Sequence, residues 1–231
     1  LHPSYQEVWL SRLGLSRARN RSVDEAGGDW IVWIDDDVRV GNSWLVAYAR
    51  AFREWPEAAF FGGPIRPSFE GRPPAWLRDA YQAVGAVREA YGSRDLGPGP
   101  RPIRQRADLP YGGNFAIRRD VLSPGAFDPR LGRQGEELLG GEELELLGRL
   151  LDRGHHGRWV PDAELEHLIP PERQTVAHLR AYFRAQGRVQ EPLPEDRPVA
   201  TLLGKPRWAW RARVQEELKY RLLRPFVSGD R

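Results

Sequence analysis

The chain has 231 residues, of which 40% are hydrophobic and 29% are charged, with a formal net charge of +3. This length can bury a substantial core in one or two domains. The absence of cysteine excludes disulfides and thiolate metal sites within the chain and favours a reducing compartment. No run approaches the ~20 apolar residues of a membrane span, and the modest net charge gives no reason to expect a nucleic-acid partner.

The first predicted elements are a helix over residues 16–27, with Ser16 as its N-cap, and a strand over residues 30–34. The strand is rich in β-branched and aromatic residues, which is typical of a buried strand in a parallel sheet. Three aspartates follow it directly: Asp35, Asp36 and Asp37. Ligands of open α/β sheets bind at this edge, so we expect Mg²⁺ or Mn²⁺ to hold these repelling carboxylates. A solvated acidic turn is the alternative.

A second helix is predicted after Asn42 or Ser43, either of which can cap it. Its apolar positions recur at helical spacing: Leu45, Tyr48, Ala49 and Phe52. Residues 60–65 predict a short strand that ends in a turn, and residues 75–91 predict one amphipathic helix.

Residues 92–110 are rich in Gly, Pro and Arg, a composition that excludes a helix or a central strand. Such a long loop is either a mobile flap beside an active site or a disordered surface loop. Two more helices are predicted, over residues 142–153 and 172–187.

The character of the chain changes near its end. Residues 205–224 combine seven Lys or Arg with Trp208 and Trp210. A basic helix of this kind either lies on an anionic membrane surface or packs on the domain with its basic face in solvent. We therefore expect a domain over residues 1–190 and a basic helical extension over residues 191–231.

Five motifs, in this order and spacing, resemble those of the family 2 glycosyltransferases of the GT-A fold. They lie at residues 14–21 with 26–30, 35–37, 112–119 with 127–128, 140–146 and 160–167. The resemblance covers roughly residues 14–187. It implies an α/β fold with a mostly parallel, Rossmann-like sheet and helices on both faces. It also implies two βα units before the acidic motif, of which we expect the first strand and the base pocket to be missing, because only 34 residues precede Asp35.

The resemblance assigns the acidic motif to the nucleotide-sugar donor. Asp35 and Asp37 take the first and last positions of a D-x-D motif, so Asp35 would contact the ribose and Asp37 would ligate the metal that bridges the diphosphate. Asp36, the variable middle residue, either shares the nucleotide contacts or points away. His167 stands where the family often places a histidine near the metal, and imidazole suits Mn²⁺ better than Mg²⁺.

Arg17, Arg19 and Asn20 match the family's A-R-N stretch, in which arginine could hold the base or the diphosphate in bidentate fashion. A solvated helix face is the alternative for Arg17. Gly113 and Asn114 match the acceptor-side motif, where glycine lets the backbone approach a sugar and the amide can bond hydroxyls. A tight turn at the start of a strand is the alternative for this pair.

Glu142 and Glu143 follow two glycines and open a helix, whose N-terminus favours an ionised carboxylate. The resemblance implies that one of them is the general base. The family usually has Glu-Asp here, so Glu143 takes the place of the base with one extra methylene, and the choice between Glu142 and Glu143 stays open. The alternative is that both only complement the helix dipole.

The resemblance predicts an inverting, metal-dependent transferase. It would move a sugar from a nucleoside-diphosphate sugar, such as a UDP-sugar, to a glycan or lipid-linked acceptor in polysaccharide biosynthesis. The expected location is cytoplasmic, with peripheral contact to the inner face of the membrane. Two other classes remain open: a non-catalytic glycan-binding module and a metal-dependent phosphoryl-transfer enzyme, which also needs clustered acids.

Overall fold

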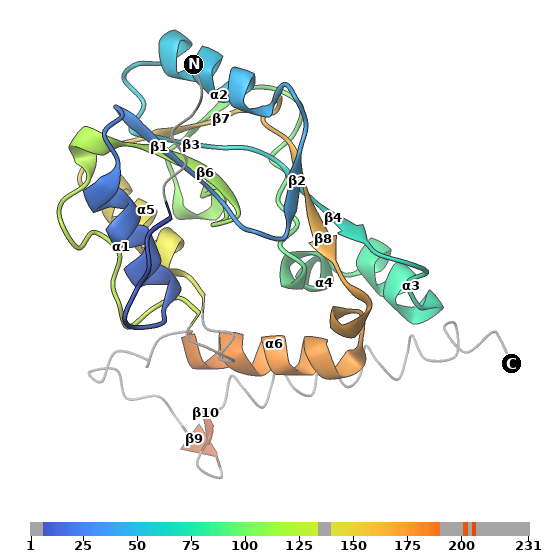
Figure 1. Ribbon diagram of the computed structural model, residues 1–231. Coiled ribbons are helices and arrows are strands. Elements are labelled where there is room, and N and C mark those ends of the chain that lie inside the picture. The colour runs from blue at the N-terminus through green and yellow to red at the C-terminus, as the bar shows by residue number, and fades with distance from the viewer. Residues whose placement is uncertain (1–6, 134–139, 190–200, 203–204, 207–231) are drawn as a thin grey trace, which may run out of the picture. The chain divides into compact units, whose positions relative to one another are not determined.

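The computed structural model describes residues 7–133, 140–189, 201–202 and 205–206 (Figure 1). Its contacts divide the chain into two units, residues 1–189 and 190–231. In the second unit, β9 (Thr201–Leu202) pairs antiparallel with β10 (Lys205–Pro206). The rest of the basic segment 205–224 lies outside the described residues. Within the described part of the chain, no helix is long and apolar enough to cross a membrane.

A five-stranded sheet forms the centre of the first unit, in the order β1-β6-β3-β7-β5. The strands are β1 (Trp30–Ile34), β3 (Phe60–Gly62), β5 (Arg101–Ile103), β6 (Asn114–Arg118) and β7 (Gly157–Trp159). The β3–β7 pair is parallel, while β1–β6, β3–β6 and β5–β7 are antiparallel. The α/β fold is confirmed, but β1 is an end strand whose described neighbour is antiparallel, so the expected parallel pairing is wrong for this strand.

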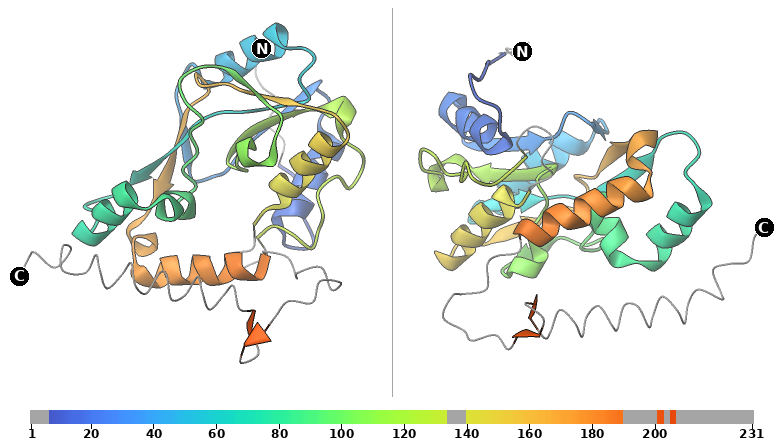
Figure 2. Two further views of the ribbon diagram at one scale, coloured as in Figure 1. Left: turned by 180° about the vertical axis from the view of Figure 1, so that it is seen from behind. Right: turned by 90° about the horizontal axis from the view of Figure 1, so that it is seen from below.

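Helices cover both faces of this sheet, as expected, because successive side chains of a strand point to opposite faces. Ile31 and Trp33 of β1 pack in one core with α1 (Leu15–Glu25) and α5 (Glu142–Asp152). Trp30 and Val32 pack in the other core with α2 (Trp44–Glu54). Figures 1 and 2 show α2 on the side of the sheet away from α1 and α5. Strand β1 is therefore covered on both faces, which explains its continuous apolar sequence.

Two local predictions on these helices are wrong. Ser16 is not the N-cap of α1. The cap position is Gly14, and the Ser16 hydroxyl instead donates a hydrogen bond to the Leu131 carbonyl at 2.7 Å. Helix α2 does follow Ser43, but it buries Trp44, Ala47, Tyr48 and Ala51. Leu45 is 58% exposed, so the helix is rotated from the predicted face.

A second, three-stranded sheet has the order β2-β8-β4. Its strands are β2 (Val38–Val40), β4 (Ile65–Phe69) and β8 (Leu165–Ile169). Strand β2 begins directly after the aspartate triplet and pairs antiparallel with β8, in a register that sets Val38 opposite His167. This pairing carries the end of the acidic motif to a histidine 130 residues away in sequence.

The segment between residues 75 and 110 is more structured than predicted. The expected helix 75–91 is two helices, α3 (Ala75–Ala83) and α4 (Gly85–Ala90), because Val84 has an extended backbone between them. The expected loop contains the edge strand β5 and a short 3₁₀ helix, η1 (Arg106–Asp108). Pro102 is tolerated in β5 because β5 lies at the end of the sheet.

Helices α3 and α4 share a third core with α6 (Val176–Val189). Tyr91, just after α4, is 1% exposed in this core, and Ile169 at the end of β8 is fully buried. The short helix η3 (Pro171–Arg173) lies between β8 and α6. This core therefore anchors the end of β8, next to His167.

The sheet gives a direct test of its packing at Gly157. A Cβ built on Gly157 overlaps the ring of Phe60 on the parallel neighbour β3. Gly157→Ala should lower the free energy of unfolding by about 1–3 kcal/mol, the usual cost of overpacking. Gly41→Ala is the matched control, because a Cβ there has no atom within 4 Å. Urea denaturation would measure both, and equal stabilities for the two variants would contradict the packing of β3 against β7.

Candidate active site

The candidate site is organised around one buried cation, Arg19 in α1, which is 4% exposed. Its guanidinium forms an ion pair with Glu142, and Nη1 lies 3.8 Å from Oε2 of Glu143. Nη2 lies 3.9 Å from Oδ1 of Asp35 and donates a hydrogen bond to the Gly112 carbonyl at 2.9 Å. One guanidinium thus joins three motifs that are far apart in the sequence.

The two glutamates at the start of α5 differ in their access to the site. The Glu142 side chain is 2% exposed, and its Oε2 has no hydrogen-bond partner among the described residues. The Glu143 side chain is 11% exposed, and its Oε1 accepts a hydrogen bond from the Gly112 N–H at 3.1 Å. Glu143 is therefore the carboxylate that a substrate can reach more easily.

Burial and the neighbouring charge of Glu143 raise the pKa of Glu142 to about 7, against the attraction of Arg19. Asp35 adds a smaller repulsion. Three carboxylates share one guanidinium here, so charge repulsion favours a proton on the most buried of them. Glu142 can therefore be neutral at physiological pH while Glu143 remains the accessible member of the pair.

Two glycines let the acidic groups approach the backbone. A Cβ on Gly112 would lie 2.7 Å from Nη2 of Arg19 and 3.2 Å from the Glu143 carboxyl carbon. A Cβ on Gly113 would lie 3.2 Å from Oδ2 of Asp35. Gly112 and Gly113 therefore let Arg19, Glu143 and Asp35 lie against the backbone more closely than a side chain there would allow.

The three aspartates have different surroundings. Asp35 is half-exposed beside Gly113, and Asp36 is exposed with no ion pair or hydrogen bond to a described side chain. Asp37 Oδ2 lies 3.3 Å from His167 Nε2. Hydrogen bonding to His167, together with Arg173, holds the pKa of Asp37 well below its usual range, so this carboxylate is ionised at neutral pH.

The backbone of Tyr91 fixes the orientation of the His167 ring. Its Nδ1 lies 2.9 Å from the carbonyl oxygen of Tyr91. A carbonyl oxygen only accepts hydrogen bonds, so Nδ1 carries a hydrogen and Nε2 is the atom that faces Asp37. With a hydrogen, Nε2 donates to Asp37; without one, its lone pair is available to a metal ion, and an Nδ1–H bond to a carbonyl is the usual arrangement of a metal-binding histidine.

Asp37 and His167 fit a divalent cation that takes its other ligands from a bound substrate. Asp37 and His167 offer one oxygen and one nitrogen donor within 3.3 Å of each other. Among the residues that the structure describes, no group of three or more His, Asp or Glu forms a complete metal-binding cluster. Mg²⁺ and Mn²⁺ commonly take their remaining ligands from substrate phosphates and water.

Sequence reasoning missed Arg173 in η3. Its Nη1 donates a hydrogen bond to Asp37 Oδ2 at 2.8 Å. The only sequence signal is its place six residues after His167, beyond two prolines, and nothing in that spacing indicates an ion pair with Asp37.

The side chain of Asn114 is buried and hydrogen-bonded within the protein. It is fully buried, and its Oδ1 accepts hydrogen bonds from Trp44 Nε1 at 3.1 Å and from the Tyr48 hydroxyl at 2.8 Å. Its Nδ2 donates to the carbonyls of Pro64 at 3.0 Å and Ala163 at 2.7 Å. All four bonding positions of the amide are used, so we leave Asn114 out of the acceptor site proposed below.

Asn20 and Arg17 also lie apart from the acidic groups. Asn20 binds both backbone groups of Phe127: Nδ2 donates to the carbonyl at 2.8 Å, and Oδ1 accepts from the N–H at 2.9 Å. Asn20 therefore ties α1 to the loop after β6. Arg17 is exposed, as the solvated-face alternative requires.

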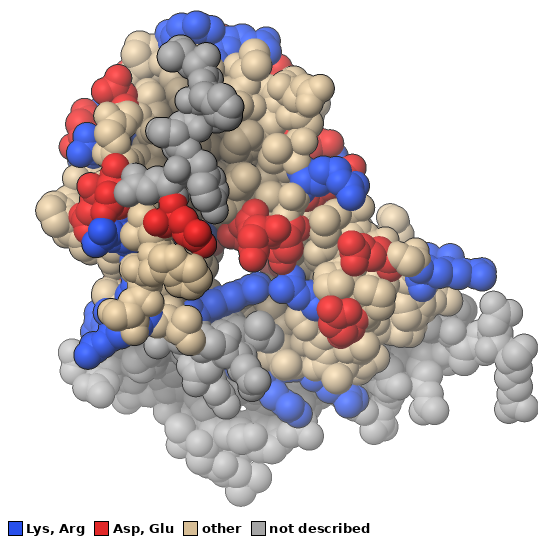
Figure 3. All heavy atoms as spheres, in the orientation of Figure 1, with Lys and Arg blue, Asp and Glu red and all other residues tan. Residues whose placement is uncertain are grey.

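Figure 3 shows acidic side chains on two sides of a hollow, in the orientation of Figure 1, with basic side chains along its lower rim.

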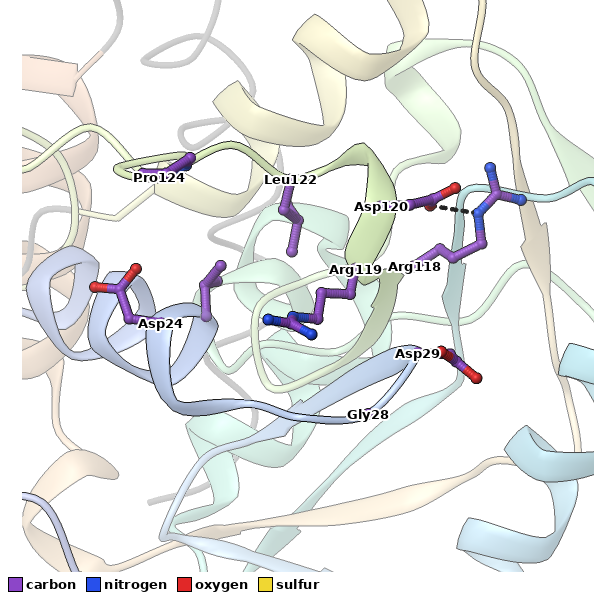
Figure 4. Close-up of a pocket in the computed structure, with 9 residues that line it drawn as sticks. Asp24, Gly28, Asp29, Arg118, Arg119, Asp120, Leu122 and Pro124 are labelled. Atoms are coloured by element: carbon purple, nitrogen blue, oxygen red, sulfur yellow. Dashed lines mark hydrogen bonds and ion pairs between the residues drawn. The ribbon is translucent and has the colours of Figure 1, made fainter.

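A separate pocket of about 660 Å³ lies at the other end of β1, lined by Gly28, Asp29 and Arg119 among others (Figure 4). Because the aspartate triplet follows the opposite end of the same strand, this pocket is not part of the candidate site.

The chain belongs to glycosyl transferase family 2, whose model matches residues 8–123, half of the chain. The match includes Arg19, the aspartate triplet and Gly112–Gly113, while Glu143 and His167 lie beyond it. The fold and the family together define a glycosyltransferase domain.

The chain is similar to two curated proteins and to one solved structure. N-acetylgalactosaminyltransferase 7 of Drosophila melanogaster is 29% identical over 167 residues, which are 68% of this chain and 27% of that protein. Succinoglycan biosynthesis protein ExoM of Rhizobium meliloti is 26% identical over 175 residues, 71% of this chain and 48% of that protein. The chain spans less than half the length of each relative. A crystal structure of GalNAc-T7 with UDP, GalNAc and Mn²⁺ covers 75% of this chain and 34% of its own, with 18% identity and a TM-score of 0.45.

The raised pKa of Glu142 predicts a pH-dependent stability. An acid whose pKa is higher in the folded state contributes stability that is fully present below its unfolded pKa, near 4.5, and is lost as the pH rises through about 7. Glu142→Gln removes this contribution. The stability of the variant relative to the parent should therefore increase between pH 5 and pH 8, by on the order of 3 kcal/mol.

Urea denaturation of both proteins at the two pH values measures this difference. Glu143→Gln is the comparison variant: it removes the neighbouring charge that helps to raise the pKa of Glu142, so its pH-dependent change should have the same direction and be smaller. A larger pH-dependent change in Glu143→Gln than in Glu142→Gln would show that the proton resides on the other carboxylate.

Proposed function

We propose that this chain carries the chemistry of a metal-dependent, inverting glycosyltransferase. It would transfer a sugar from a nucleoside-diphosphate sugar, most simply a UDP-sugar, to a glycan or lipid-linked acceptor. One observation carries the proposal: Arg19 lies within 4 Å of both Asp35, on the donor side, and the Glu142–Glu143 pair, on the acceptor side. The family membership supports the donor class.

In the proposed reaction, Glu143 accepts the proton of an acceptor hydroxyl. The hydroxyl oxygen forms a bond to the anomeric carbon of the sugar while the bond from that carbon to the diphosphate oxygen breaks, and the nucleoside diphosphate leaves. Its greater exposure favours Glu143 over Glu142 as the base. Arg19 and the Gly112 N–H hold the Glu143 carboxylate in place. Glu142 is the buried ion-pair partner of Arg19.

Asp37 and His167 would hold Mn²⁺ or Mg²⁺, and Asp35 would bind the nucleotide. The ion supplies positive charge that stabilises the leaving diphosphate. Gly113 would line the space between donor and acceptor, since its lack of a side chain leaves Asp35 accessible. A role for Asp36 and Arg17 in nucleotide binding stays a prediction, because both are exposed and neither has a contact that positions it.

Two expectations about partners and location belong to this proposal. Peripheral contact with an anionic membrane depends on residues 205–224, most of which lie outside the described residues. The cytoplasmic location and the role in polysaccharide biosynthesis are consistent with a lipid-linked acceptor. The rival phosphoryl-transfer enzyme would release phosphate without sugar transfer, and the rival glycan-binding module would bind without turnover.

The metal assignment can be tested by thermal stability. A ligand that binds only the folded state raises the melting temperature, so UDP with Mn²⁺ should stabilise the parent more than UDP alone. Asp37→Asn should lose this Mn²⁺-dependent increment. Asp36→Asn is the matched control, because it makes the same charge change at an exposed neighbour without a side-chain partner. An undiminished increment in Asp37→Asn would remove Asp37 from the metal site.

The base assignment can be tested by turnover. Glu143→Gln keeps the shape of the side chain and removes its basicity, so UDP release from a panel of UDP-sugars with candidate acceptors should fall by about 10²-fold or more. The Mn²⁺-dependent stabilisation by UDP should remain. Glu142→Gln provides the comparison. Parental turnover in Glu143→Gln together with lost turnover in Glu142→Gln would move the base to Glu142.

A further inference from the structure

Arg173 lies on the carboxylate atom that the metal site needs. Its Nη1 is 2.8 Å from Asp37 Oδ2, and His167 Nε2 is 3.3 Å from the same oxygen. A divalent cation held by Asp37 and His167 would compete with the guanidinium for this oxygen, which is the one nearest to His167. The guanidinium and the cation carry like charges, so both cannot keep their best position on Oδ2 at once.

The turn that carries Arg173 is held firmly, whereas its side chain is not. The Tyr91 hydroxyl donates a hydrogen bond to the Arg173 carbonyl at 3.1 Å. The next residue, Gln174, is 4% exposed and donates to the carbonyls of Glu70 and Ile169, both at 2.8 Å. The Arg173 side chain is 30% exposed, and among the described residues it forms its ion pair with Asp37. The guanidinium can therefore change partners without a movement of the backbone.

We propose that Arg173 is an exchange residue of this site: it neutralises Asp37 while the metal is absent, and it moves to the donor diphosphate when nucleotide and metal bind together. This inference rests on the proposed function of the same site. A diphosphate group offers the planar guanidinium a bidentate partner that replaces the carboxylate. Metal alone offers no such replacement.

The exchange has a thermodynamic consequence. Without nucleotide, the metal must break the Arg173–Asp37 ion pair and leave the guanidinium without an anion. With nucleotide, the diphosphate receives the guanidinium and also ligates the metal. Metal and nucleotide should therefore strengthen each other's binding by more than shared ligation alone provides, and the coupling must be the same in both directions.

The test is calorimetric titration of the full chain and of Arg173→Gln with MnCl₂ alone, UDP alone and each in the presence of the other. The variant lacks the competing cation, so it should bind Mn²⁺ alone more tightly, by roughly tenfold, within the usual range of such couplings. It should bind UDP alone more weakly, because one phosphate partner is lost. The factor by which UDP strengthens Mn²⁺ binding should fall accordingly.

Arg39→Gln is the matched control. Arg39 lies two residues after Asp37, pairs with Glu166 at 3.2 Å and is 68% exposed. The substitution removes one positive charge from the same neighbourhood without touching Asp37. Equal gains in Mn²⁺ affinity in Arg39→Gln and Arg173→Gln would overturn the exchange, because they would show only a general effect of net charge.

The remaining outcomes separate the inference from the function on which it rests. If the parent binds Mn²⁺ with UDP and Arg173→Gln binds Mn²⁺ alone no more tightly than the parent, the exchange is wrong and the metal site stands. If Arg173→Gln binds Mn²⁺ more weakly, Arg173 only orients Asp37, and the exchange is again wrong. If the parent binds no Mn²⁺ with or without UDP, both the metal site and the inference fail.

Discussion

The candidate site depends on one buried charge. Arg19 is 4% exposed and contacts Glu142, Glu143 and Asp35. A buried guanidinium without partners would cost several kcal/mol, so α1 can pack against the sheet only when the acids at the end of β1 and the start of α5 are also in place. The ion pairs thus fix the position of Asp35 relative to Glu142 and Glu143.

The buried side-chain amide of Asn114 also holds several segments of the chain together next to the site. Asn114 bonds Trp44 and Tyr48 of α2 through its oxygen, and the carbonyls of Pro64 and Ala163 through its nitrogen. These four bonds connect α2, the chain after β3 and the loop before β8 at the point where β6 begins. The bonds of Asn114 therefore hold the start of β6 in place. The backbone of Gly112 and Gly113, just before it, lies close to Asp35 and Glu143.

The small sheet brings together Asp37 and His167, the two residues proposed to hold the metal. The β2–β8 register brings Asp37 next to His167, and the Tyr91 carbonyl fixes the imidazole. Tyr91 also bonds the Arg173 carbonyl through its hydroxyl. One buried tyrosine therefore positions both the imidazole of His167 and the guanidinium of Arg173 around the same carboxylate. Under the proposed exchange, this arrangement would link metal binding to the arrival of an anion that can accept Arg173.

The sequence by itself determined the α/β class, strand β1 with its acids, the helix after Gly141 and the family resemblance, because these rest on local apolar patterns, turn residues and motif order. Only the tertiary structure decided the partners of those residues. Local pattern cannot show that Arg19 is buried among three carboxylates, that Asn114 is fully bonded, or that Arg173 reaches Asp37 across 136 residues. Strand direction likewise depends on long-range pairing, which is why β1 was expected in a parallel pair and lies antiparallel to β6.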